Sequence, residues 1–219
     1  MKNALTVSAL VLIAASAQAD VISGLVTADN HYALYAGDGT TAALIGRNEM
    51  GAGGAPGTYN WSRPESWAFN AQAFLYIVAW SDDSVAQGVL AQLTNIDTGD
   101  TYNSGDPRWQ VYATFTQRGD GSAEPSVGEL MSYVLTADAG DLWQTPVTGG
   151  LNGVNPWGTV PGIGGDVRWM WVANPGQSNA LIGGSGYGET LVFRMAVPAP
   201  GAAAALGLGG LAALRRPRR

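Results

Sequence analysis

The chain has no cysteine and a single histidine, His31, among its 219 residues. The lack of cysteine excludes disulfides, a thiol nucleophile and cysteine metal ligands. With one histidine and no cysteine, a zinc centre is not expected either. A Ser-His-Asp triad would have to use His31, which lies in a predicted strand, and no G-x-S-x-G stretch accompanies it. We therefore expect a protein that is not an enzyme.

Basic residues are scarce in the central part of the chain. Residues 20–197 hold all 17 Asp and Glu residues but only six arginines and no lysine, so their formal charge is 6 − 17 = −11. Such a negative field argues against nucleic acids and anionic membrane surfaces as partners. It suits a soluble domain outside the cell.

The N-terminus has the features of a secretory signal. Lys2 supplies a positive charge, residues 4–15 are mostly apolar, and Ala17-Gln18-Ala19 is an A-x-A site. We expect residues 1–19 to be removed by signal peptidase, with cleavage before Asp20. The alternative is a retained N-terminal anchor, although the apolar run is shorter than the roughly 20 residues that a bilayer requires.

The C-terminus has three parts in a fixed order. Pro198-Ala199-Pro200 comes first, residues 201–214 are only Gly, Ala and Leu, and four arginines, among them Arg215 and Arg216, close the chain. The positive-inside rule would keep the arginines on the cytoplasmic side of a membrane. We therefore expect residues 197–219 to form an apolar helix for sorting or anchoring, and to be the only part that enters the membrane. The alternative is a frayed Ala-rich tail.

This order of parts resembles a PEP-CTERM sorting signal, in which the usual tripeptide is Pro-Glu-Pro. Ala199 stands in place of the Glu, and the resemblance covers only residues 197–219. It implies recognition by an exosortase-type transpeptidase and delivery to the cell surface or extracellular matrix. It also implies a Gram-negative type of envelope with transient anchoring at the inner membrane. It implies nothing about the activity of the preceding domain.

Residues 20–196 read as one all-β domain. Glycine and proline account for 31 and 11 residues, but eight Trp and eight Tyr argue against disorder. Short apolar runs between turn residues predict strands, and residues 74–80 are the most apolar of them, typical of a central strand. With no helix expected beyond a single turn near residues 137–142, the strands should form an antiparallel, jelly-roll-like β-sandwich of about 8–10 strands. The predicted strands are 21–27, 31–36, 42–47, 67–70, 74–80, 88–93, 109–115, 130–135, 167–172 and 190–197.

The same region resembles the galactose-binding-like jelly rolls of bacterial surface proteins. The resemblance is carried by T-A-D-N-H-Y-A-L-Y at residues 27–35, G-V-L-A-Q-L at 88–93, N-P-W-G at 155–158 and R-W-M-W at 168–171. Residues 36–39 depart from the Asn-Gly turn that is frequent in that group. The resemblance implies a carbohydrate-binding or adhesive β-sandwich, although many members have no known ligand.

Aromatic residues in loops are the main binding candidates, because sugar faces stack on aromatic rings. Four of them lie in Gly/Pro-rich segments, where loops carry function on a rigid scaffold. Packing inside the fold is the alternative for each. The candidates are Trp61, Trp157, Tyr59 and Tyr187. Tryptophans in predicted strands should instead belong to the core; these are Trp80, Trp109, Trp169 and Trp171.

Acidic turns are candidates for a structural Ca²⁺ ion, which prefers oxygen ligands. The alternative is local hydrogen bonding, because Asp favours turns for that reason alone. The candidate ligands are Asp29, Asp38, Asp82 and Asp83.

Three interpretations of function remain. The first is an exported, non-catalytic protein of the cell surface or matrix that binds polysaccharide. The second is a purely structural surface protein. The third is a secreted glycoside hydrolase, which requires two carboxyl groups in one cleft about 5–10 Å apart. The candidates for that pair are Asp82, Asp83, Glu65 and Glu129.

Overall fold

The computed structural model describes residues 19–49, 60–81, 86–119, 121–173 and 189–198. The expected signal peptide and sorting segment therefore lie outside the described residues, except for Ala19 and residues 197–198. Residues 19–199 belong to one structural unit. No helix within the described ranges is long and apolar enough to cross a membrane.

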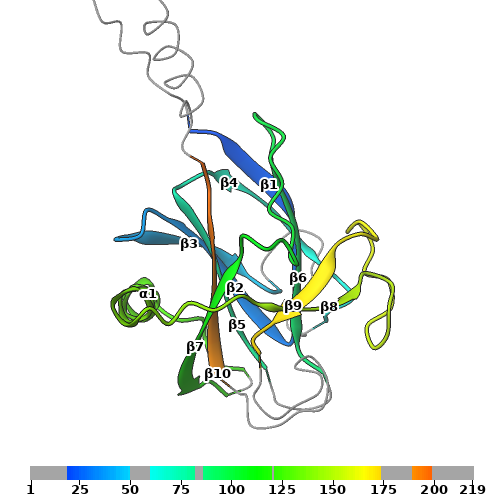
Figure 1. Ribbon diagram of the computed structural model, residues 1–219. Helices are drawn as coiled ribbons and strands as arrows, with labels where there is room; N and C mark the ends of the chain where they lie inside the picture. Colours follow the sequence, from blue (N-terminus) through cyan, green and yellow to red (C-terminus); the bar gives the residue numbers. More distant parts are fainter. Residues whose placement is uncertain (1–18, 50–59, 82–85, 120, 174–188, 199–219) are drawn as a thin grey trace, which may run out of the picture. The chain divides into compact units, whose positions relative to one another are not determined.

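The described residues form ten strands in two antiparallel sheets, and one helix (Figure 1). The predicted mostly-β architecture with two antiparallel sheets is thus confirmed. Sheet 1 has the strand order β4 (Glu65–Asn70), β1 (Val21–Asp29), β6 (Gly88–Asn95), β9 (Arg168–Trp171) and β8 (Val147–Leu151). Sheet 2 has the order β3 (Ala42–Arg47), β2 (His31–Gly37), β5 (Phe74–Trp80), β10 (Glu189–Ala196) and β7 (Gln110–Gln117).

Strand β5 is the middle strand of sheet 2, as its apolar sequence predicts. Successive side chains of a strand point to opposite faces of the sheet. Leu75, Ile77 and Ala79 belong to the core between the two sheets, whereas Tyr76 and Val78 belong to a second apolar cluster. Burial on both faces explains why the strand is a nearly continuous apolar run instead of an alternating one.

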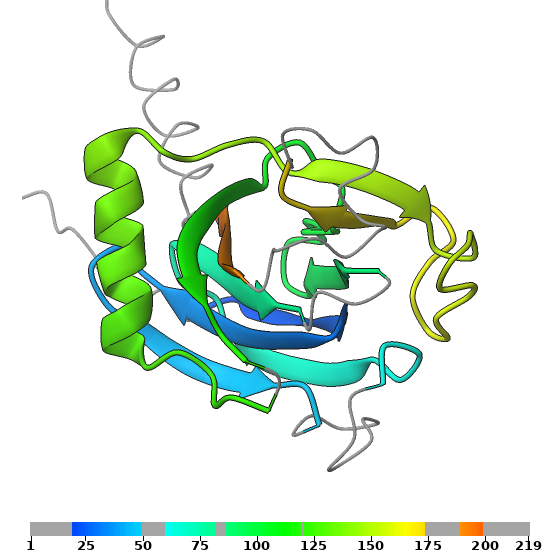
Figure 2. The same cartoon turned by 90° about the horizontal axis from the view of Figure 1, so that it is seen from below.

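The second cluster lies under the helix α1 (Val127–Gly140), where the sequence prediction was wrong. Residues 130–135 were expected to form a strand, and only a single helical turn was expected further on. Ser126 and Glu129 form a capping box, in which each side chain accepts a hydrogen bond from the other's backbone N–H. The buried helical residues recur with helical spacing. Most of them pack on residues of sheet 2, against which α1 lies (Figure 2). Both the capping box and the spacing were readable signals; the buried residues are Leu130, Met131, Val134 and Ala137.

Strand β8 was not predicted, because its sequence V-T-G-G-L lies in a glycine-rich stretch that resembles a loop. Glycine weakens a strand and gives no side chain to pack. The strand is at the edge of sheet 1, and its pairing with β9 shifts register between Thr148 and Leu151. Pairing with β9, not local preference, therefore defines this strand.

Strand β7 is an edge strand whose regular alternation stops halfway. Trp109, Val111 and Ala113 alternate along the chain and are buried in the core between the sheets. Phe115 should follow them inward, but it is 76% exposed and has φ 57°. The pairing of β7 with β10 shifts register in the same region. Such a β-bulge redirects the side chains that follow it, and here it turns Phe115 outward.

The outer edge of β7 is joined to the chain that follows α1. The backbone N–H groups of Val111 and Gln144 each donate to the other's carbonyl oxygen at 2.8 Å. From there the chain continues to β8, and so connects α1 with sheet 1 (Figure 2). We call residues 141–148 the crossing segment.

Candidate functional site

An open pocket of about 250 Å³ lies between β7 and the start of the crossing segment. Three of its lining side chains are aromatic, so we call it the aromatic pocket. Its lining residues are Tyr112, Ala113, Phe115, Asp141, Leu142, Trp143 and Gln144. Phe115 is displayed by the bulge in β7, and Leu142 is also exposed. The pocket thus presents accessible aromatic rings, on which the face of a sugar could stack.

The three rings come from two elements and meet at the pocket. Tyr112 is buried and lies edge-on to Trp143, with ring centroids 6.2 Å apart and planes at 65°. Edge-to-face contacts of this kind are favourable for aromatic pairs. Tyr112 therefore supports Trp143 from within the fold, and Phe115 is the most accessible of the three rings.

Trp143 is held in place by contacts with Asp138 and Arg194. Its indole Nε1–H donates to Asp138 Oδ1 at 2.8 Å, and the guanidinium carbon of Arg194 lies 3.9 Å from its ring centroid. Arg194 is itself fixed, because its Nη1 donates to Asp138 at 2.7 Å and its Nη2 donates to Gln110 at 2.8 Å. A ring that is already oriented loses less conformational freedom when a ligand binds.

Two exposed polar side chains, those of Asp141 and Gln144, line the aromatic pocket. Asp141 ends α1 in the left-handed conformation, with φ 50°, and its N–H donates to the carbonyl of Ala137. Carboxylate and amide groups accept hydrogen bonds, and the amide also donates them. The pocket therefore combines ring faces with partners for hydroxyl groups.

A second pocket, of about 270 Å³, lies further along the crossing segment. We call it the threonine pocket; its lining residues are Gly105, Asp106, Pro107, Thr145, Pro146, Thr148 and Met170. Both threonines are exposed, whereas Met170 is buried. Asp106 pairs with Arg108, whose Nη2 lies 2.8 Å from its Oδ2, and this hydrogen bonding holds the pKa of Asp106 below its usual range.

The structure does not display Trp157, which was a binding candidate. The side chain is only 5% exposed, stacks on Trp169 with centroids 4.0 Å apart, and donates from Nε1 to Asp29 Oδ2 at 2.7 Å. It belongs to the core, so it offers no open ring face to a sugar. Trp61 is partly buried against the same core. Tyr59 and Tyr187 lie outside the described residues.

The four tryptophans of predicted strands are fully buried, as expected. One of them, Trp80, stacks on His31 with centroids 5.0 Å apart, and Arg47 and Arg118 lie 5.9 and 5.8 Å from its ring. His31 is therefore buried within the fold, where it supports an aromatic stack.

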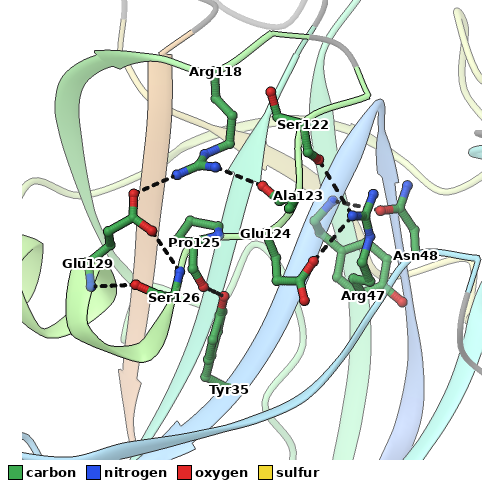
Figure 3. Close-up of polar contacts among 11 residues, drawn as sticks. Tyr35, Arg47, Asn48, Arg118, Ser122, Ala123, Glu124, Pro125, Ser126 and Glu129 are labelled. Carbon is green, nitrogen blue, oxygen red and sulfur yellow. Dashed lines mark hydrogen bonds and ion pairs between the residues drawn. The ribbon is translucent and has the colours of Figure 1, made fainter.

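The two arginines beside Trp80 attach the chain before α1 to sheet 2 (Figure 3). Arg47 pairs with Glu124 at 3.2 Å, and Arg118 pairs with Glu129 at 3.1 Å. Glu129 also accepts the Ser126 N–H at 2.8 Å, and this hydrogen bond lowers its pKa. Glu129, a candidate catalytic carboxylate, is thus engaged in starting the helix.

Glu65, the other described candidate for a catalytic pair, is only 3% exposed. It accepts hydrogen bonds from the Tyr32 hydroxyl at 2.7 Å and from the Glu49 N–H at 2.8 Å. Burial raises its pKa despite these bonds. Asp82 and Asp83 lie outside the described residues. Each of the two pockets is lined by one carboxyl group, Asp141 or Asp106, and not by a pair.

The described calcium candidates have other partners. Asp29 accepts the Trp157 indole N–H, and Asp38 Oδ1 accepts the backbone N–H groups of Thr40 and Thr41 at 2.8 and 2.7 Å. These bonds lower the pKa of Asp38 to about 2. Among the described residues, no three His, Asp or Glu side chains gather at a point where they could hold a metal ion.

Sequence reasoning did not identify the ring residues of the aromatic pocket. Phe115 follows an alternating pattern that predicts an inward side chain, and only the bulge against β10 reverses it. Trp143 follows a helix that was not predicted at its full length. The only local indication was the position of Trp143, which lies two residues after Asp141 and two residues before Thr145-Pro146.

Comparison of the chain with protein-family models, with curated proteins and with solved structures gave no match. The two family resemblances drawn from the sequence therefore stay predictions.

Proposed function

We propose that the protein is an exported, non-catalytic component of the cell surface or extracellular matrix, and that it binds polysaccharide at the aromatic pocket. The observation that supports this most is the exposed ring of Phe115 beside the clamped ring of Trp143, with the polar groups of Asp141 and Gln144 at the same pocket. Ring faces bordered by hydrogen-bonding groups suit the alternating apolar and hydroxyl surfaces of a sugar.

The terminal segments support the location. The expected signal peptide and the PEP-CTERM-like tail favour export, followed by transient inner-membrane anchoring and recognition by an exosortase-type enzyme. The jelly-roll-like organisation, inferred from the resemblance to galactose-binding-like domains, agrees with a binding role. The absence of cysteine is compatible with an exported domain that is stabilised by packing alone.

The proposal is tested by titrating the full-length chain with cello-, xylo-, manno- and malto-oligosaccharides while tryptophan fluorescence is recorded. Saturable binding is expected, and Phe115→Ala should weaken it about tenfold, because truncating a central aromatic side chain typically costs roughly 1–2 kcal/mol of binding energy. Ile96→Ala is the control, because it removes another exposed apolar side chain that lines neither pocket.

Binding that is unchanged by Phe115→Ala would place the sugar elsewhere and refute this site. No binding in any of the four series would favour the purely structural surface protein. Hydrolysis of any oligosaccharide during the titration would contradict the non-catalytic part of the proposal.

A further inference from the structure

The two pockets lie at opposite ends of one pair of antiparallel chain segments. The mutual hydrogen bonds between Val111 and Gln144 form the centre of this pair. Residues 112–115 and 141–144 line the aromatic pocket on one side of it, and residues 105–107 and 145–148 contribute to the threonine pocket on the other. The crossing segment therefore contributes lining residues to both pockets, with Gln144 at one and the adjacent Thr145 at the other.

The spacing between the pockets exceeds the length of one sugar ring. The parts of the crossing segment that line them are centred about four residues apart, which corresponds to about 13 Å at roughly 3.3 Å per extended residue. Each pocket is smaller than the roughly 300–1,000 Å³ of a site for a drug-sized ligand. A monosaccharide can therefore occupy one pocket at a time, whereas a chain can reach both.

We infer that the aromatic pocket and the threonine pocket are successive subsites for one linear, uncharged polysaccharide chain that runs along the crossing segment. This inference rests on the proposed function, and it specifies the class of ligand. The aromatic pocket supplies ring faces through Phe115 and Trp143. The threonine pocket supplies the hydroxyl groups of Thr145 and Thr148, which donate and accept hydrogen bonds.

The charges of the two pockets determine the preference for an uncharged chain. Each pocket is lined by one carboxyl group and by no basic side chain. Arg108, which lies close by, is paired with Asp106, and Arg194 is paired with Asp138. These arginines already have carboxylate partners, so a uronate would find no free cation among the residues lining either pocket and would meet the carboxyl group of Asp141 at the aromatic pocket. Residues 20–197 add a formal charge of −11 at longer range.

The crossing segment, which connects the two subsites, is held in place before any ligand binds. Gln144 is held by two backbone hydrogen bonds of 2.8 Å, and Trp143 is held by Asp138 and Arg194. When two sites are held at a fixed distance, binding at the second becomes intramolecular once a chain occupies the first. Affinity should therefore rise with chain length until the chain spans both pockets.

The test uses the full-length chain and the same four neutral series, from the disaccharide to the hexasaccharide, with oligogalacturonates as the acidic probe. Affinity should rise at least about tenfold between disaccharide and hexasaccharide, and the oligogalacturonates should bind more weakly at low salt. The double variant Thr145→Ala/Thr148→Ala should lose about five- to tenfold for the hexasaccharide and nothing for the disaccharide, as expected for two lost hydrogen bonds. Ser66→Ala, an exposed hydroxyl on β4, is the matched control.

The outcomes separate this inference from the proposed function. Affinity that is already maximal at the disaccharide, or a hexasaccharide affinity that the double threonine variant leaves unchanged, overturns the extended site while a single-pocket binding protein stands. Tighter binding of oligogalacturonates overturns the uncharged ligand class. Failure of every probe to bind overturns the proposed function and this inference together.

Discussion

Strands β5 and β7 lie in the same sheet and are separated only by β10, yet they serve different purposes. In β5 both faces are covered, one by sheet 1 and the other by α1, and every residue from Leu75 to Trp80 is buried. In β7 burial ends with Ala113, and the bulge then displays Phe115. The difference shows how one sheet can be buried on both faces at its centre and display an aromatic side chain to solvent at its edge.

The largest effect on stability is expected at the centre. Ile77→Ala removes a fully buried side chain from the core between the sheets, and should lower the free energy of unfolding by about 2–5 kcal/mol. Denaturant unfolding of the full-length chain measures this. Ile96→Ala removes the same atoms at a position that is 61% exposed, and should cost less than about 0.5 kcal/mol. Equal losses in the two variants would contradict the burial described for β5.

An edge position can also be buried, and Glu65 on β4 shows the consequence. Burial raises its pKa above the ordinary value of 4.5, so the folded chain holds this proton more tightly than the unfolded chain does. Its contribution to stability is therefore present below pH 4.5 and is lost as the pH rises through the raised folded-state value. Glu65→Gln should flatten this fall in the free energy of unfolding, measured by denaturant unfolding at a series of pH values.

A substitution of Tyr32, which donates a hydrogen bond to Glu65, tests the same buried site and leaves the carboxyl group in place. Tyr32→Phe removes one of the donors to Glu65, together with the acceptor of the Trp67 indole N–H, and should cost about 1–3 kcal/mol of unfolding free energy. A pH profile of Glu65→Gln that is as steep as that of the unmodified protein would show that another group titrates in this range. No loss of stability in Tyr32→Phe would show that the bond is not formed in solution.

Substitutions in α1, the helix that covers β5, are expected to have a moderate effect on stability. Ser126→Ala removes the N-cap of α1 and should lower the free energy of unfolding by about 1 kcal/mol. Ser126→Thr keeps the accepting oxygen and is the control. If the alanine and threonine variants lost the same stability, the capping hydrogen bond would not be what stabilises the helix.

The smallest effect on stability should come from the edge itself. Phe115→Ala removes a ring that is 76% exposed, so the free energy of unfolding should change by less than about 0.5 kcal/mol, measured by the same denaturant unfolding. The same variant should lose about tenfold in glycan affinity. A large loss of stability instead would identify Phe115 as a structural residue and blur the distinction between β5 and β7.

The sequence predicted those strands whose local sequence pattern is sufficient to define them. The bounds expected for residues 42–47 and 74–80 are those of β3 and β5, because apolar side chains and flanking turns define both strands locally. The sequence prediction failed where contacts with residues far along the chain determine whether a side chain is buried or exposed. Trp157 lies in a Gly/Pro-rich loop, but Trp169 and Asp29 draw it into the core, the latter from 128 positions away. The exposure of Phe115 depends on its register with β10, which no local pattern contains.

The missed prediction of α1 has a different cause, because the signals for this helix lie in the local sequence. Ser126 and Glu129 stand three residues apart in the capping-box pattern, and Leu130, Val134 and Ala137 repeat with helical spacing. The short apolar run at residues 130–135 was interpreted as a strand because it is flanked by turn residues. The position of Trp143 after the helix, and with it the aromatic pocket, could not be inferred once the helix was missed.

The most direct test of glycan binding at the edge of sheet 2 is a nuclear magnetic resonance titration of the ¹⁵N-labelled full-length chain with neutral hexasaccharides. The indole N–H of Trp143 and the amides of residues 112–115, 141–145, 147 and 148 should shift in a saturable way. The indoles of Trp109, Trp169 and Trp171, which are buried, should not. Shifts confined to other residues, or no shift with any of the four neutral series, would contradict the account.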